Sequence, residues 1–194
     1  MQTGNLNERI KVYEFENMPS KENKKIWGKA TEKNARCVFC QNGVSALKTM
    51  TFTVYEGNKI NETNILELKN RKYLPVSIIP NKNPVYVDII CAPVNIKTML
   101  IYKNVNETDE NRLVISTKME EKEIQVIFAS KYVSLTSNSV FNTENRSYVV
   151  VIPKNTDIDS GTVVKIDNVF YYVTACLENG EFFNEYQLEI KEDA

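Results

Sequence analysis

Residues 64–73 read NILELKNRKY, and residues 162–171 read TVVKIDNVFY. Both stretches consist of a short apolar run, a polar pair that ends in Asn, and a returning run that ends in Tyr. Asn tolerates the left-handed backbone that a two-residue turn requires, so each stretch predicts a tight β-hairpin. Tyr171 follows Tyr73 at the same interval, 98 residues, at which Asn168 follows Asn70. We therefore expect a tandem duplication in which both tyrosines point into a core.

The rest of the chain has the same β-rich character. Short apolar runs recur through both halves, separated by turn signals such as residues 41–43, 57–58 and 80–84. Runs spaced by roughly 8–12 residues with such punctuation are typical of β-sandwiches and small barrels. We expect an all-β fold of two small β-barrel-like or sandwich-like lobes with little helix. The expected strands lie near residues 9–16, 35–40, 51–55, 64–68, 72–79, 85–91, 98–103, 113–116, 124–129, 148–152, 162–166, 169–176 and 186–190.

The chain of 194 residues is long enough for two small domains. A polar stretch at residues 104–111 separates the two β-rich halves. We expect an N-terminal β-barrel-like domain at residues 1–95, a linker or long loop at residues 96–111, and a C-terminal β-barrel-like domain at residues 112–194.

One segment between two expected strands has helical spacing. Val44, Leu47 and Met50 recur at every third position, as in a helical turn. Their side chains either fill the core or form a loop that docks into a partner, and we take these three residues as candidate partner contacts. Trp27, the only tryptophan, is expected to anchor the core, with Ile26 or Gly28 at a bend.

The chain contains no histidine. This absence excludes Ser-His and Cys-His nucleophilic pairs and histidine-based acid–base catalysis. Carboxylate pairs remain open, but the acidic clusters at residues 107–110, 119–123 and 157–159 lie in polar runs, as solvated faces do. With 24 basic and 25 acidic residues, the whole chain has no electrostatic reason to bind nucleic acid tightly. The sequence therefore favours a protein that is not an enzyme.

Four cysteines, Cys37, Cys40, Cys91 and Cys176, include one CxxC pair. That pair ends a β-rich run and the other two cysteines are far apart, so neither a redox site nor a zinc ribbon is favoured. The N-terminus has no signal-peptide pattern, and no apolar run approaches the ~18 residues of a membrane helix. We expect a protein made and used without secretion, with reduced thiols, no metal and no cofactor.

The order of motifs along the chain resembles a known family. Residues 4–12 read GNLNERIKV, residues 27–30 read WGKA, residues 35–38 read ARCV and residues 51–54 read TFTV, before the hairpin at residues 64–73. A leading Arg-Ile strand, a Trp, a loop-bearing β-meander and a hydrophobic strand, turn and Tyr occur in this order in head–tail joining proteins of tailed bacteriophages. The chain resembles their stopper or head-closure class, which has a small β-barrel.

The resemblance covers residues 4–92 and, more loosely, residues 147–191, whereas a typical family member has one such domain. It implies a structural virion protein at the head–tail junction, assembled in the cytoplasm of a bacterial host. The implied partners are further copies of itself in a ring, portal and tail or neck proteins, and double-stranded DNA that passes without sequence-specific contact; no membrane is implied. Neither a catalytic residue nor a cofactor is implied. The alternatives are another tail or baseplate structural protein, and a β-barrel module that binds a ligand or nucleic acid.

Overall fold

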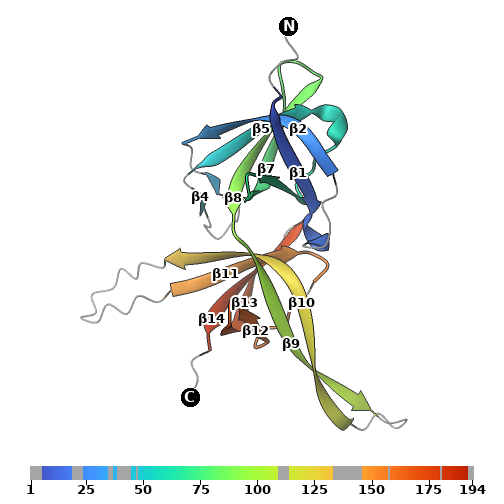
Figure 1. The fold of residues 1–194 in the computed structure, drawn as a ribbon. Coiled ribbons are helices and arrows are strands. Elements are labelled where there is room, and N and C mark those ends of the chain that lie inside the picture. The colour runs from blue at the N-terminus through green and yellow to red at the C-terminus, as the bar shows by residue number, and fades with distance from the viewer. Residues whose placement is uncertain are drawn as a thin grey trace, which may run out of the picture. The chain divides into compact units, whose positions relative to one another are not determined.

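A computed structural model of the chain describes residues 6–18, 24–34, 37–38, 45–46, 48–108, 114–132, 146–156, 158–179 and 181–191. The chain divides into two compact units, Met1–Ile96 and Lys97–Ala194, each built around a closed barrel of strands (Figure 1). The expected all-β fold with two small lobes and little helix is confirmed.

The first unit is a six-stranded antiparallel barrel closed in the order β1-β2-β5-β8-β7-β6. A separate two-stranded sheet pairs β3 with β4, and two short 3-10 helices, η1 and η2, follow β1 and β5. The elements are β1 (Glu8–Glu14), η1 (Phe15–Asn17), β2 (Lys24–Lys33), β3 (Cys37–Val38), β4 (Ser45–Ala46), β5 (Thr49–Tyr55), η2 (Glu56–Asn58), β6 (Asn64–Leu68), β7 (Arg71–Pro80) and β8 (Tyr86–Val94).

The second unit is also a six-stranded antiparallel barrel, closed in the order β10-β11-β14-β13-β12-β9. The strands β9 and β10 are much longer than β12, which is the shortest strand of this barrel. The elements are β9 (Ile96–Thr108), β10 (Val114–Tyr132), β11 (Arg146–Pro153), β12 (Val163–Ile166), β13 (Val169–Asn179) and β14 (Phe183–Ile190).

The two barrels have the same connectivity. Read from its first strand, the first barrel runs β1-β2-β5-β8-β7-β6, and the second runs β9-β10-β11-β14-β13-β12. In both, three strands follow one another around the barrel, and the next three close it in reverse order. This shared order supports the tandem duplication that the sequence predicts.

The two hairpins that suggest the duplication have the same turn. Lys69 and Asn70 have φ values of 52° and 64°, and Asp167 and Asn168 have φ values of 49° and 67°. Two successive residues with positive φ are the mark of a type I′ turn, whose twist matches that of the flanking strands. The Lys69–Asn70 and Asp167–Asn168 pairs therefore form the same type of turn in the two barrels.

The tyrosine after each turn is buried, as the duplication predicts. Tyr73 pairs with Leu66, and Tyr171 pairs with Val164, at the matching position of the second hairpin. Both tyrosines are only 5% exposed. The Tyr73 ring meets Phe52 edge-on, with ring centres 5.4 Å apart.

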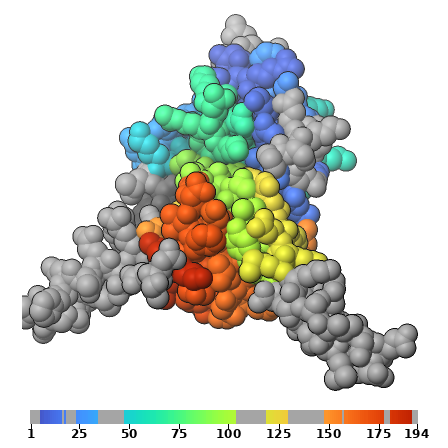
Figure 2. Space-filling view, turned by 60° about the horizontal axis from the view of Figure 1, so that its bottom comes forward, coloured from blue at the N-terminus to red at the C-terminus, as the bar shows by residue number. Residues whose placement is uncertain are grey.

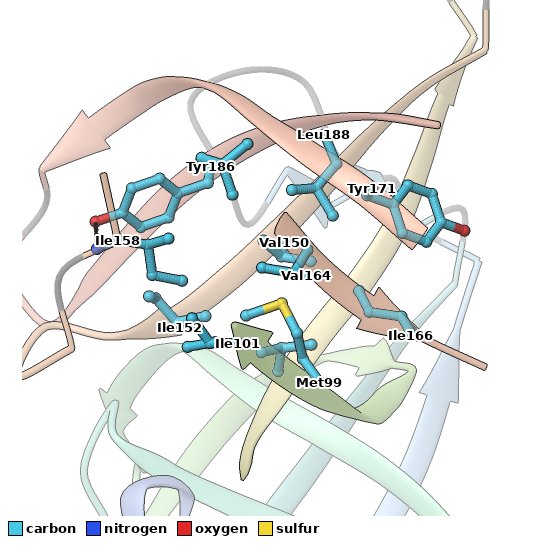
Figure 3. Close-up of a cluster of buried hydrophobic side chains, with 12 residues drawn as sticks. Met99, Ile101, Val150, Ile152, Ile158, Val164, Ile166, Tyr171, Tyr186 and Leu188 are labelled. Carbon is cyan, nitrogen blue, oxygen red and sulfur yellow. Dashed lines mark hydrogen bonds between the residues drawn. The ribbon is translucent and has the colours of Figure 1, made fainter. Parts of the chain in front are cut away.

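Each barrel is filled by its own hydrophobic core. The second core gathers aliphatic side chains from every strand around Met99 and Ile101, and Figure 3 shows Tyr171 at one end and Tyr186 at the other. The Tyr186 hydroxyl accepts a hydrogen bond from the Ile158 N–H at 3.3 Å, which ties the segment before β12 to β14. The first core is formed by Ile10, Val12, Ile26, Phe52, Val54, Leu66, Leu68, Tyr73, Ile89 and Cys91.

The expectation that Trp27 anchors the core is wrong. Strand β2 buries Ile26 and Gly28, and alternation places Trp27 on the opposite, outer face, where it is 53% exposed. The inner face has no room for a large side chain here, because even a Cβ on Gly28 would lie 2.6 Å from Ile10 Cδ1. Strand β2 itself is also absent from the expected strands, because its outer face carries lysines.

Three further expectations need correction. Strand β9 covers residues 96–108, so the strand expected at residues 98–103 extends further into the stretch expected as a linker or long loop, and its residues Met99 and Ile101 are fully buried. Residues 114–132 form one continuous strand where two were expected. The described residues of the segment expected as a helical turn are extended: β4 covers residues 45–46, and β5 begins at Thr49, in a run rich in β-branched residues.

Candidate functional site

Of the three candidate partner contacts, the structure describes only Met50. Val44 and Leu47 lie outside the described residues. Met50 lies on β5, opposite Glu32 of β2 and Cys91 of β8. Its side chain is partly buried against the first core. The structure therefore places Met50 in the barrel wall and not in a docking loop.

The three cysteines that the structure describes lie on three different strands, β3, β8 and β13. Cys91 is buried in the first unit and Cys176 is exposed in the second. The backbone of Cys37 lies in β3, and Cys40 lies outside the described residues. Within the described ranges, no three His, Cys, Asp or Glu side chains gather in a way that could hold a metal ion. In the same ranges, no helix combines the length and apolarity needed to cross a membrane.

A row of four residues crosses the outer face of the first barrel: Arg9, Trp27, Tyr55 and Tyr86, called here the aromatic row. Arg9 pairs with Trp27, and Tyr55 pairs with Tyr86. Because Gly28 pairs with Val54, Trp27 and Tyr55 occupy facing positions one step further along β2 and β5. Trp27 and Tyr55 are each 53% exposed. The row therefore presents two large rings to solvent on neighbouring strands.

Charged and polar side chains lie within the aromatic row and on both sides of it. The Arg9 guanidinium lies 5.4 Å from the centre of the Trp27 ring, within the range of a cation–π contact. The ammonium of Lys11, two residues along β1, lies 2.7 Å from a carboxylate oxygen of the largely buried Glu67. On the other side, the Thr53 hydroxyl and the Asn81 amide both donate to the Asp88 carboxylate. The row combines Trp, Tyr and Arg, the residue types that dominate the energetics of protein interfaces.

The second unit carries a surface groove of about 620 Å³, called here the β9 groove. Strand β9 contributes Tyr102 and Lys103, and β10 contributes Met119. The remaining walls come from Phe170 on β13, from Lys191 after β14, and from residues 159–163. In Figure 2 the yellow atoms of β10 lie beside the light-green atoms of β9, and orange atoms of the later strands adjoin them. A volume of this size matches the pockets that hold small ligands or short peptide segments.

Aromatic rings and lysines are paired on this face of the second barrel. The rings of Tyr102 and Phe170 are tilted, with centres 6.0 Å apart. The ammonium of Lys165 lies 5.2 Å from the Phe170 ring centre, and that of Lys191 lies 5.5 Å from the Tyr172 ring centre. These contacts orient the aromatic rings, and they place the two lysine ammonium groups beside the apolar surface that the rings form.

The turn that forms one wall of the groove is fixed by backbone hydrogen bonds. The N–H of Gly161 donates to the carbonyl of Val173 at 2.7 Å, and the N–H of Val173 donates to the carbonyl of Thr162 at 3.0 Å. The Ser160 hydroxyl donates to the carbonyl of Thr174 at 2.9 Å. Gly161 has φ of 86°, a conformation that favours glycine, and no atom lies within 4 Å of where its Cβ would stand. Hydrogen bonds to β13 therefore hold this wall, and the space beside Gly161 is open.

In the part of the chain that the structure describes, two ionisable groups have shifted pKa values. Burial raises the pKa of Tyr171, and the neighbouring Tyr148 and Asp167 raise it further. A hydrogen bond and charge attraction from Lys48, whose ammonium lies 2.8 Å away, lower the pKa of the exposed Glu32 carboxyl. Neither Tyr171 nor Glu32 lines the β9 groove. These shifts are explained by core packing and by a surface ion pair.

Sequence reasoning found neither the aromatic row nor the β9 groove. One signal was present in β13, where Tyr171 and Val173 point inward while Phe170 and Tyr172 point outward. A strand with large apolar residues on both faces has an outer face that packs against something or stays partly exposed. The acidic run at residues 119–123, expected as a solvated face, is exposed and belongs to β10.

No family model, curated protein or solved structure matches the chain when it is compared with each.

Proposed function

We propose that this chain is a structural subunit of the ring that joins the head of a tailed bacteriophage to its tail. The observation that carries the proposal is the duplicated hairpin, in which an apolar strand, a two-residue turn and an inward tyrosine recur with the same register. The sequence resemblance to head–tail joining proteins rests on this hairpin and on the strands before it.

The residues that carry the resemblance are also those that build the first barrel. Residues 4–12 include most of β1, residues 27–30 lie in β2 and residues 51–54 lie in β5. Ile10, Gly28 and Phe52 lie on the inner faces of these strands. The resemblance therefore follows a barrel framework and involves no catalytic group, which supports a structural role.

A ring subunit needs two different surfaces that meet in neighbouring copies. The aromatic row on the first unit and the β9 groove on the second are two unlike surfaces that could serve contacts of this kind. A net charge of -1 suits a wall along which DNA slides without tight binding. In this proposal the ring contacts the portal and the tail, helps to retain the packaged genome, and performs no catalysis.

Quantitative mass spectrometry of DNase-treated, density-purified particles from the source culture tests the proposal. The expected result is a small, fixed number of copies per particle, in constant ratio to the portal protein. A ring of fixed symmetry requires such a constant ratio.

Absence from purified particles, with the protein abundant in the host cytosol, would overturn the proposal. That outcome would favour a β-barrel module that binds a ligand. A copy number that rises and falls with tail length would instead indicate a tail structural protein.

A further inference from the structure

The two units of the chain have opposite net charges, which the near-neutral total conceals. Residues 1–96 contain 14 lysines and arginines against 9 aspartates and glutamates, a net charge of +5. Residues 97–194 contain 10 basic against 16 acidic residues, a net charge of -6. Such an asymmetry between the halves of a chain is typical of proteins whose basic half meets a polyanion, such as a nucleic acid or an anionic membrane surface.

Four cations of the first unit surround Trp27 on the outer face of its barrel. Lys25 and Lys29 lie two residues before and after Trp27 on β2, so their side chains leave the same side of the sheet. On the neighbouring β1, Arg9 pairs with Trp27 and Lys11 pairs with Lys25. These four residues are called here the basic patch. With the facing positions of β5, the outer-face neighbours of Trp27 are Arg9, Lys11, Lys25, Lys29, Thr53 and Tyr55, and none of them is a carboxylate.

The carboxylates that border the basic patch already have partners. Glu67 of β6 lies 2.7 Å from the Lys11 ammonium, and Glu8 lies 3.2 Å from the Lys69 ammonium. Asp88 of β8 accepts hydrogen bonds from a hydroxyl and an amide. The basic patch therefore keeps an excess of positive charge beside Trp27, and this local excess agrees with the net charge of the unit.

Two aromatic rings adjoin the basic patch. Trp27 and Tyr55 are each about half exposed, and they occupy facing positions on neighbouring strands, where Cβ atoms lie about 5 Å apart. The Tyr55 ring lies where a Cβ on Gly57 would stand, so the glycine leaves room for it. Glu56 is exposed in the same 3-10 helix, and the ammonium of Lys24 donates to a carbonyl of that helix. Two aromatic surfaces thus lie side by side among cations.

This combination fits one kind of polyanion better than the others. Unpaired bases stack on aromatic rings while cations hold the phosphates that connect them. A duplex keeps its bases stacked inside, so it would use the cations and leave the rings without a contact. An acidic peptide likewise has no flat group to place on the rings. A membrane would favour aliphatic side chains that insert between lipids, whereas Thr53 and lysines stand beside the rings.

We propose that the first unit binds single-stranded nucleic acid across β1, β2 and β5, which lie side by side in the barrel (Figure 1). Bases stack on Trp27 and Tyr55, and the basic patch holds the phosphates. Binding is independent of base sequence, because every base has an aromatic face, and it is weak, because only two rings and a few cations take part. The inference goes beyond the neck role and concerns the first unit alone, so it is tested separately from the composition of particles.

Trp27 itself supplies the measurement, because it is the only tryptophan of the chain. A single strand of about ten thymidines is titrated into the full-length chain while tryptophan fluorescence is recorded, since a base stacked on the indole quenches its emission. Saturable quenching is expected at about 20 mM salt, with a dissociation constant on the order of 10–100 μM. Raising the salt to about 200 mM is expected to weaken binding by roughly 100-fold, as for about three phosphate contacts.

Three variants separate stacking from charge. Tyr55→Ala keeps the Trp27 signal and is expected to weaken binding at least about fivefold, with little effect on folding because the ring is on the outer face. Lys29→Glu is expected to weaken binding about tenfold or more and to reduce its salt dependence. Lys154→Glu makes the same change of charge at an exposed position of the second unit, and it is expected to bind as the parent chain does.

Three results would overturn the proposal. One is the absence of saturable quenching at low salt, or binding that Tyr55→Ala leaves unchanged. Another is equal binding of a duplex of the same length, of a glutamate peptide or of vesicles of anionic phospholipid, which would make the patch a general anion or membrane contact. The third is self-association of the chain that Lys29→Glu abolishes, which would make the patch a contact between copies.

Discussion

Gly28 lies at a tightly packed point on the inner face of the first barrel. A Cβ at this position would lie 2.6 Å from Ile10 Cδ1, 3.0 Å from Val54 Cγ1 and 3.1 Å from the carbonyl oxygen of Thr53. Because two of these atoms belong to the core and one to the backbone of the paired strand, the neighbours must shift. We predict that Gly28→Ala lowers the free energy of unfolding by about 1–3 kcal/mol, measured by urea denaturation.

Gly57→Ala is the matched control. A Cβ at Gly57 would meet the Tyr55 ring at 2.3 Å, but that ring is on the surface and can turn away. The expected loss is below about 1 kcal/mol, as for most surface substitutions. Equal losses for the two variants would show that the inner face of β2 is not tightly packed at Gly28.

Tyr171 makes stability depend on pH in the alkaline range. Burial, with Tyr148 and Asp167 nearby, raises its pKa, so the folded protein keeps this proton at a pH where the unfolded chain has lost it. The folded state then binds more protons, and the free energy of unfolding falls as pH rises past the ordinary tyrosine value of about 10. Below that pH the contribution is fully present. We predict that Tyr171→Phe makes this alkaline decline shallower in denaturant titrations at a series of pH values.

Tyr172→Phe separates this effect from the general loss of a phenol, because Tyr172 lies on the outer face of the same strand. The prediction would be contradicted if the Tyr171→Phe variant and the parent chain lost stability equally steeply above a pH of about 10.

At the scale of elements, the two β-hairpin turns give the most direct test of the duplication. Asn70 and Asn168 both have left-handed backbone, with φ of 64° and 67°. A β-branched residue is strained there, so Asn70→Val and Asn168→Val are each predicted to cost about 1–2 kcal/mol of stability. Glycine accepts this conformation, so Asn70→Gly and Asn168→Gly are predicted to be close to neutral. Chemical denaturation of the four variants measures both effects.

A true structural repeat requires the two turns to respond alike. A large loss from valine at one turn and none at the other would mean that the second hairpin can adopt another turn type, and that its likeness to the first is superficial.

The same hairpins show how much of the fold could be predicted. An apolar run, an Asn-containing turn and a tyrosine are local signals, so β6, β7, β12 and β13 and the burial of both tyrosines were within reach of the sequence. Strand β2 was not, because its exposed face is lysine-rich and its buried face includes a glycine. The prediction for Trp27 was wrong because the size of its ring favoured the core. Alternation along β2 buries Ile26 and Gly28 and so places Trp27 on the surface.

The β9 groove and the aromatic row could not be predicted from the sequence for a different reason. The β9 groove brings together Tyr102, Met119, Phe170 and Lys191, which come from separate strands and a terminal segment. Only the register of the closed barrel makes them neighbours, and register is a property of the whole sheet. The aromatic row likewise depends on the pairing of four strands.

At the scale of the whole molecule, each unit has what an independent domain needs. Both barrels are closed, and each has its own hydrophobic cluster. A domain of about 100 residues can bury enough apolar surface to fold alone. We predict that residues 1–96 and residues 97–194, expressed separately, each unfold cooperatively, as measured by near-UV circular dichroism and urea titration.

A fragment cut inside a barrel distinguishes this prediction from simple collapse. Residues 1–68 lack β7 and β8, so β5 and β6 lose a neighbour each and the core loses Tyr73 and Ile89. This fragment is expected to lack a cooperative transition, because an opened sheet exposes both its edges and its apolar face. If the two intact units behaved no better than this fragment, barrel closure would not be enough to stabilise each unit. The duplication would then have produced one interdependent fold, and a single barrel of this kind could not serve as a subunit without its second copy.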